Sequence, residues 1–225
     1  MHVSELLHFA EHRLQEVALV IMALVYTTRL IWFFRFAPMT ERQAPTGRIT
    51  TNPKKGSTYS LFNVAMPWAM ESTRRNFFFY MQFALFHIGV IASLTMSFII
   101  PYAPNLISSK NAILLLQVLF GCAFLIGCMR IIRRFTVKVM RAISTPDDYF
   151  SLILLTIWFL FAFLAAPNNP AQGESALLTY FLLTAFFILY VPFSKISHYL
   201  YYPFMRYYLG KSLGRRGVFP LQRGN

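Results

Sequence analysis

The chain has 225 residues, of which 56% are hydrophobic and 17% are aromatic. A soluble domain of this size cannot bury so much apolar surface, so the composition excludes an ordinary water-soluble fold and indicates a membrane protein. The formal net charge of +13 would suit a nucleic-acid-binding protein. The basic residues, however, are concentrated in alternate linkers between apolar segments, and this placement argues against nucleic acid as a partner.

Five apolar segments are long enough to cross the roughly 30 Å hydrocarbon core of a bilayer as helices, which rise about 1.5 Å per residue. They cover residues 14–36, 77–100, 111–132, 149–166 and 176–202. The first 16 residues lack the positive start and the cleavage site of a signal peptide, so we expect the first segment to stay in the mature protein. The sequence therefore predicts an all-α integral membrane protein, a five-helix bundle forming a single domain over residues 1–225.

The linkers between these segments differ in charge. Lysine and arginine are frequent in linkers 37–75 and 133–148 and after residue 202, whereas linker 101–110 has only Lys110 and linker 167–175 has no basic residue. Basic loops stay in the cytoplasm, so the N-terminus is predicted to lie outside and the C-terminus in the cytoplasm. Residues 37–60, rich in proline, glycine and charge, predict an irregular cytoplasmic loop, and residues 203–225 a basic cytoplasmic tail.

The fourth segment begins with Ser144-Thr-Pro-Asp-Asp148, which combines an N-cap residue, a proline in the first turn and two acids at the positive end of a helix. We expect Asp147 and Asp148 to cap this helix, and the alternative is that they take up protons for a redox site. Cys122 and Cys128 match no metal or redox motif, and we expect both to be small packing residues.

Two histidines lie within the apolar segments, His87 in the second and His198 in the fifth. An ionisable side chain inside a span suggests a functional site, and neutral imidazole is a good axial ligand for haem iron. The two segments run in opposite directions, so the histidines can face each other in the cytoplasmic half or the middle of the bundle. A haem between them also needs a small residue beside a ligand and cations for its propionates. The residues that meet these needs are Gly89, Lys195, Arg74, Arg75 and Arg130.

Simpler interpretations stay open for every histidine. His87 and His198 can each bond to a neighbouring helix without a cofactor. His2, His8 and His12 precede the first span, and a spacing of four places the last two on one helix face, where they could share a metal ion. No third ligand is evident nearby, and solvated side chains at the interface are the alternative for all three.

Two strings carry a family resemblance: Phe86-His-Ile-Gly89, and Val191-Pro-Phe-Ser-Lys-Ile-Ser-His198 followed by Pro203, which is expected to end the last helix. They resemble the gamma, cytochrome b subunit of respiratory nitrate reductase. They are equally similar to its DsrM-like relatives in sulfite reductase-linked complexes and in the high-molecular-weight and tetrahaem cytochrome c complexes of sulfate reducers. The resemblance implies a membrane subunit, itself without catalytic residues, that exchanges electrons with menaquinone and passes them through haem b to a cytoplasmic iron–sulfur partner.

The resemblance also implies a place and partners. His87 and His198 match the positions where the family ligates its cytoplasmic-side haem. The membrane would be the cytoplasmic membrane of a bacterium or archaeon, and the iron–sulfur subunit would be heterodisulfide reductase-like or nitrate reductase beta-like. Other membrane subunits and a periplasmic multihaem cytochrome c are further implied partners. The aromatic segment 198–208 would dock the iron–sulfur subunit, or instead form an aromatic belt with basic anchors at anionic lipid.

The chain departs from the family at the second, outer-side haem. Counted along the same two helices, the ligands of that haem fall at Ser97 and Tyr180, and neither side chain can replace an imidazole. We therefore expect one haem b, with the outer half of the bundle filled by side chains or used by another partner; Met96, His8 and His12 are weaker alternative ligands. Because the family's quinone site is associated with the outer haem, electrons could instead enter from a neighbouring membrane subunit. The competing prediction is a cofactor-free membrane scaffold or assembly subunit.

Overall fold

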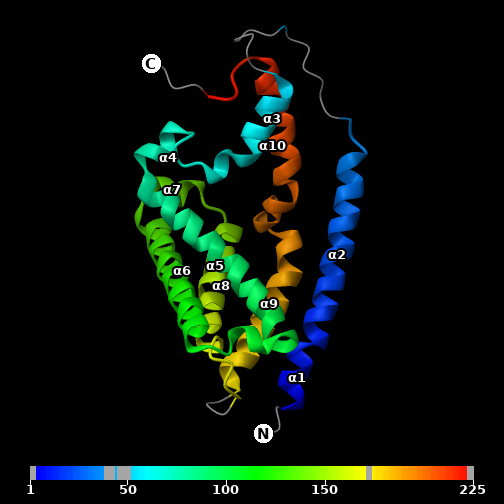
Figure 1. Ribbon diagram of the computed structural model, residues 1–225, viewed down its shortest axis with the longest axis vertical. Coiled ribbons are helices and arrows are strands. Elements are labelled where there is room, and N and C mark those ends of the chain that lie inside the picture. Colours follow the sequence, from blue (N-terminus) through cyan, green and yellow to red (C-terminus); the bar gives the residue numbers. More distant parts are fainter. Residues whose placement is uncertain (1–3, 38–43, 45–51, 171–173, 222–225) are drawn as a thin grey trace. The chain divides into compact units, whose positions relative to one another are not determined.

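The structure is a computed structural model that describes residues 4–37, 44, 52–170 and 174–221 (Figure 1). Within these residues all regular structure is helical. The predicted single domain corresponds to two compact units. The first unit comprises Met1–Thr27 and Gln82–Ile196, and the second comprises Thr28–Met81 and Ser197–Asn225.

In the part of the chain that the structure describes, five helical segments are long and apolar enough to cross a membrane. They are Glu5–Phe34, Phe77–Tyr102, Lys110–Thr136, Pro146–Ala165 and Ser175–Phe193. Their exposed faces carry large apolar side chains such as Leu24 and Leu115, which are 64% and 70% exposed. Apolar faces of this kind are expected for helices that lie in lipid. Over the described residues, the predictions of an all-α protein and of five helical segments long and apolar enough to cross a membrane are confirmed.

The first unit is built around α8 (Pro146–Ala165), which lies against α6 (Lys110–Thr136) and α9 (Ser175–Tyr190). The indole ring of Trp158 is completely buried and stacks on Phe187 with ring centroids 4.7 Å apart. Its N–H donates to the hydroxyl of Thr184 at 2.8 Å. Aromatic packing of this kind stabilises the contact and orients the two helices. The same unit contains most of α5 (Phe77–Tyr102), together with α1 (Glu5–Glu11), the first half of α2 (Arg13–Phe34) and α7 (Lys138–Ile143).

The start of α8 has the capping chemistry that its sequence predicts. Thr145 is the N-cap residue and Pro146 occupies the first turn. The carboxylate of Asp148 accepts the backbone N–H of Thr145 at 2.7 Å and its hydroxyl at 2.8 Å. An acid at this position also interacts favourably with the positive end of the helix. The capping interpretation of Asp148 is confirmed.

The predicted fifth span is not one continuous helix. α9 ends at Tyr190, and two short 3₁₀ turns, Val191–Phe193 and Lys195–Ser197, precede α10 (His198–Arg215). Pro192 has no N–H to continue the helical bonding, and Ser194 between the two turns is extended, with ψ of 172°. The prediction of an unbroken helix over residues 176–202 is therefore wrong, because the helix is interrupted between Tyr190 and His198.

Three further predicted boundaries differ from the structure. Pro203 does not end the last helix, since α10 continues through it to Arg215, and the first part of the predicted tail is thus helical. The predicted irregular loop 37–60 contains the start of α3 (Pro53–Phe62), which Asn52 caps by accepting the N–H of Lys55. Most of that loop, residues 38–43 and 45–51, lies outside the described residues.

The second unit is built on α3 and α10, which lie side by side and antiparallel (Figure 1). Near one end of the pair, the hydroxyl of Tyr202 donates to the carbonyl of Leu61 at 3.2 Å. Near the other, a Cβ added to Gly214 would lie only 2.6 Å from the carbonyl oxygen of Asn52. Glycines at this contact let the two backbones approach more closely than any larger residue would permit. The unit also contains α4 (Glu71–Arg75) and the adjoining ends of α2 and α5.

Candidate functional site

His87 lies on α5, in the first unit, and its ring orientation is fixed by its own helix. Nδ1 lies 2.7 Å from the carbonyl oxygen of Phe83, one turn earlier, and the two rings are in contact with centroids 4.2 Å apart. A carbonyl oxygen can only accept a hydrogen bond, so Nδ1 carries the proton. In a neutral ring the lone pair then resides on Nε2, and a metal would have to bind through that nitrogen.

The surroundings of His87 contain one of the predicted cations. The guanidinium carbon of Arg130, on α6, lies 4.7 Å from the ring centre of Phe86 in a cation–π contact. Phe86 in turn packs edge-on against Phe159 of α8, with centroids 5.1 Å apart. A Cβ added to Gly89 would lie 2.8 Å from the side chain of Ala123. A close local contact with Ala123 of α6 therefore accounts for this glycine, which was predicted to admit a haem ring.

The other predicted residues His198, Arg74 and Arg75 belong to the second unit. His198 is the first residue of α10, and its side chain is exposed. Arg74 and Arg75 end the short helix α4, and Arg75 forms an ion pair with Glu71 of the same helix. His87 and His198 thus lie in different units, and their pairing stays a prediction.

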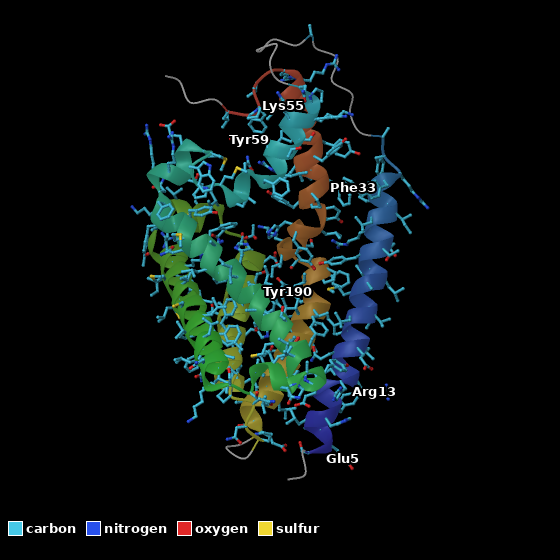
Figure 2. All side chains as sticks on the ribbon, in the orientation of Figure 1. Glu5, Arg13, Phe33, Lys55, Tyr59 and Tyr190 are labelled. Carbon is cyan, nitrogen blue, oxygen red and sulfur yellow. The ribbon has the colours of Figure 1, made fainter. Side chains whose placement is uncertain are left out.

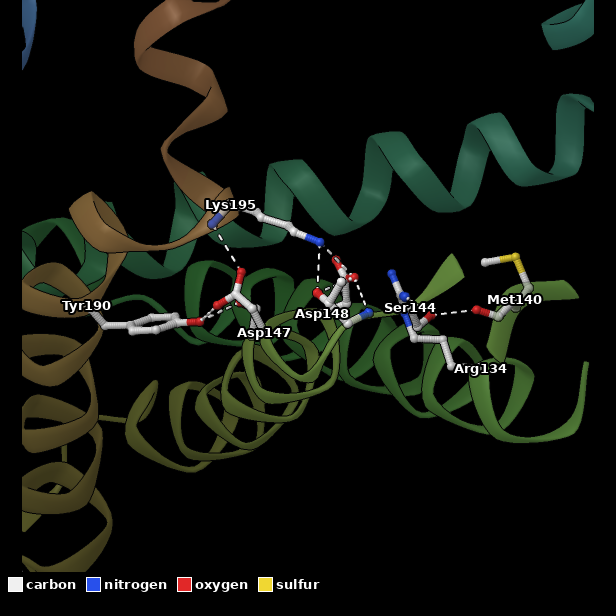
Figure 3. Close-up of polar contacts among 9 residues, drawn as sticks. Arg134, Met140, Ser144, Asp147, Asp148, Tyr190 and Lys195 are labelled. Carbon is white, nitrogen blue, oxygen red and sulfur yellow. Dashed lines mark hydrogen bonds and ion pairs between the residues drawn. The ribbon is translucent and has the colours of Figure 1, made fainter. Parts of the chain in front are cut away.

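Lys195 is engaged by the start of α8 (Figure 3). Its ammonium group donates to the carboxylate of Asp148 at 2.9 Å and to the hydroxyl of Thr145 at 2.8 Å. Its backbone N–H donates to the carboxylate of Asp147 at 3.2 Å. Lys195 was predicted to pair with a haem propionate, whereas in the structure its ammonium group forms an ion pair with Asp148.

Asp147 does not cap α8 and instead joins it to the end of α9. Its carboxylate accepts a short hydrogen bond from the hydroxyl of Tyr190, which also lies 2.8 Å from the hydroxyl of Ser151 (Figure 3). With the bond from the Lys195 N–H, the same carboxylate contacts both the end of α9 and the irregular segment between α9 and α10. This arrangement holds that segment against the start of α8, and proton uptake by Asp147 stays a prediction.

The positions matched to the family's outer haem are brought together and closely packed. Tyr180 is completely buried, and its hydroxyl donates to the backbone carbonyl of Ser93 on α5 at 2.5 Å. Ser97, one turn further along α5, is 2% exposed and bonds to its own helix at Leu94. Met96 is 1% exposed. Side chains therefore fill this part of the first unit, and the number of haems stays a prediction.

His8 and His12, two of the three N-terminal histidines, also lie together. The rings of His8 and His12 are 4.7 Å apart, and Tyr102 packs edge-on against His12 at 5.3 Å. Among the residues with described positions, no group of three or more histidines, cysteines or acids could hold a metal ion. The predicted shared face of His8 and His12 is therefore present, while His2 lies outside the described residues.

Two features of the structure were missed from the sequence. The α3–α10 contact depends on Gly56, Gly210 and Gly214, and the sequence signal was present as Gly-x-x-x-Gly at 210–214 and Gly-x-x-x-Ser at 56–60. The bond between Tyr190 and Asp147 carried no local signal, because it joins residues 43 positions apart.

Comparisons with known proteins identify no family. The chain is 26% identical over 169 residues to a protein of Nitratidesulfovibrio vulgaris (strain Hildenborough), and the match covers 69% of this chain and 70% of that protein. The name of that protein states no activity. No family model matches the chain, and no solved structure matches it. A functional assignment must therefore be argued from the residues themselves.

Proposed function

We propose that this chain is the membrane-anchoring electron-transfer subunit of a respiratory redox complex. It carries one haem b with His87 and His198 as axial ligands, and it crosses the cytoplasmic membrane with its N-terminus outside and its C-terminus in the cytoplasm. Electrons pass between menaquinone, or a membrane or periplasmic donor, and a cytoplasmic iron–sulfur subunit. The haem supplies the redox chemistry, and the chain supplies ligation, orientation and electrostatics.

The observation that carries this proposal is the hydrogen bond from His87 Nδ1 to the carbonyl of Phe83 at 2.7 Å. Metal-binding histidines typically donate their second ring N–H to a carbonyl or carboxylate, which fixes the tautomer and makes the other nitrogen a better ligand. His87 has this arrangement inside an apolar helix, where an imidazole is otherwise costly. The residue thus fits an axial ligand as well as it fits a helix contact.

Two other contacts support the details of the proposal. Arg130 lies over Phe86, the residue next to His87, so a cation that can pair with a propionate is already held nearby. The buried bond from Tyr180 to Ser93 closes α9 onto α5, where a second haem would need open space and a second pair of imidazoles. The first contact supports a haem close to His87, and the second favours one haem per chain.

The test is a reduced-minus-oxidised visible spectrum of the purified full-length chain in detergent. We expect a sharp b-type α-band in the wild type and its loss in both His87→Ala and His198→Ala. The matched control is His12→Ala, which removes an imidazole from the same chain and should leave the band unchanged. The haem-to-protein ratio should be close to one.

Different outcomes would redirect the proposal in different ways. If a haem-replete host yields a folded wild-type chain with no α-band, the cofactor-free scaffold replaces the cytochrome. A ratio close to two would overturn the single haem and would direct attention to His8 and His12. If only one of the variants His87→Ala and His198→Ala lost the band, the assignment of the other histidine as a ligand would be wrong.

A further inference from the structure

The two longest helices of the second unit are basic. Neither α3 nor α10 contains an aspartate or a glutamate. Lys55 projects from α3, as does Tyr59 one turn later (Figure 2). Four exposed cations lie near the start of α3 and the end of α10. We call them the basic end of the α3–α10 pair: Lys54, Lys55, Lys211 and Arg215.

The glycine contact brings these four cations to one place. The antiparallel register sets the start of α3 beside the last turns of α10, because Gly214 lies against Asn52 and Gly210 lies against Gly56. Arg206, one turn before Gly210, points its guanidinium at the α3 backbone instead and donates to Ser60 O at 3.0 Å. Arg206 therefore helps to hold α3 and α10 together, while the four cations of the basic end are exposed on the surface of the pair.

The basic end lies beyond the level at which the first apolar span stops. Phe204 of α10 packs against Phe33 and Phe34, the last residues of α2, with ring centroids 5.8 Å and 5.0 Å away. Lys211 and Arg215 follow Phe204 by 7 and 11 residues, which corresponds to about 10 Å and 16 Å along a helix. The polar headgroup layer is only about 5–7 Å deep on each side of the hydrocarbon core. Measured along α10, the two charges therefore lie further from Phe204 than the headgroup layer is deep.

We propose that the basic end of the α3–α10 pair binds an acidic surface of a soluble cytoplasmic protein. This inference rests on the proposed function, which places the two helices on the cytoplasmic side. Charge complementarity of this kind steers association and sets the register of the complex.

The experiment uses the full-length chain in nanodiscs of phosphatidylcholine and a fluorescent polyglutamate peptide of about 20 residues as the acidic probe. We expect saturable binding that weakens strongly between 0.05 M and 0.5 M salt, since screening shortens the reach of exposed charges. Lys211→Glu/Arg215→Glu should weaken binding about tenfold or more. The matched control is Lys138→Glu/Arg141→Glu, which reverses two exposed cations on α7 and should change binding less than about twofold.

A second arm separates a protein partner from anionic lipid. The same variants are measured in nanodiscs of phosphatidylglycerol, and the ratio between wild type and Lys211→Glu/Arg215→Glu should be retained. If the ratio falls to one there, headgroups occupy the basic end and the inference is wrong. Equal weakening by the α7 control in phosphatidylcholine would also overturn it. Helix content by circular dichroism checks that both variants are folded, and the haem spectrum is a separate readout, so a missing α-band with intact probe binding refutes only the proposed function.

Discussion

The two units hold their helices together by different means. In the first unit, side chains fill the contacts around α8, including Thr156 against Gly127 of α6, and buried groups such as Trp158 and Tyr180 add hydrogen bonds to other helices. In the second unit, α3 meets α10 almost backbone to backbone at Gly56, Gly210 and Gly214. In the first unit the helices are held by packed side chains, and in the second α3 and α10 are held by close approach of their backbones at glycines.

The difference follows from what each helix has available to bury. α8 is apolar nearly throughout, and in lipid such helices gain nothing from hydrophobicity alone, so shape and hydrogen bonds must select their partners. α3 and α10 carry many polar and charged residues, and their contact depends on close van der Waals approach. A side-chain contact can absorb a small change in volume, whereas a backbone contact cannot.

The largest expected effect is in the second unit, for Gly210→Ala. The new Cβ would lie 2.5 Å from the carbonyl oxygen of Gly56 and 2.7 Å from Cα of Ser57, and neither atom can move without moving α3. We expect the α3–α10 pair to lose about 3 kcal/mol of stability, the upper part of the usual range for overpacking. Hydrogen–deuterium exchange in detergent should show faster exchange over both α3 and α10.

The first unit provides the matched control, Gly121→Ala on α6. A Cβ at residue 121 would meet the ring of Phe163 at 3.8 Å, an ordinary contact distance. The substitution should change stability by less than about 1 kcal/mol, with improved helix propensity on the favourable side. If both alanines were tolerated equally, the contrast between backbone and side-chain contacts would be wrong.

Much of the helical layout could be predicted from the sequence because it depends on local properties. The apolar segments are long, and their residues have to be hydrophobic wherever lipid is the solvent, so α5, α6 and α8 lie within a few residues of their predicted positions. The cap at Thr145 and Asp148 was equally local, since both partners lie within one turn. Patterns of this kind need no knowledge of the fold.

The rest depended on contacts between distant residues. The break before His198 is fixed partly by Pro192, which is visible in the sequence, and partly by Asp147, which lies on another helix. Lys195 was assigned to a cofactor because its ion pair with Asp148 joins residues 47 positions apart and has no local signal. The helix α3 was missed because its residues are neither apolar nor periodic, and it is held chiefly by its packing on α10.

A medium effect is expected at the break in the first unit, for Asp147→Asn. The carboxylate accepts from the Tyr190 hydroxyl and from the Lys195 N–H, and an amide has one acceptor oxygen for these two donors. Losing one charge-assisted hydrogen bond costs about 1–3 kcal/mol locally. Amide exchange at Lys195 and Ile196 should accelerate while α9 stays protected.

The control for that change is Tyr190→Phe, which removes one of the two bonds and leaves the Lys195 N–H bonded. Exchange at Lys195 should then rise less than it does in Asp147→Asn. Equal exchange in the two variants would show that the tyrosine, and not the Lys195 N–H bond, fixes the break.

The smallest expected effect lies at the other end of the first unit, where Glu174 is tied to the start of α1. The hydroxyl and the backbone N–H of Ser4 bond to this carboxylate, the N–H at 3.0 Å, and hold the pKa of Glu174 below its ordinary value of 4.5. A carboxyl group with a lowered pKa stabilises the folded state above that ordinary value, and the contribution is lost as pH falls through the lowered pKa. Exchange at the first-turn amides of α1, corrected for the intrinsic pH dependence, should therefore increase on acidification below pH 4.5. Glu174→Gln should remove this dependence, Ser4→Ala should reduce it because the backbone bond remains, and an unchanged profile in Glu174→Gln would mean that another group titrates there.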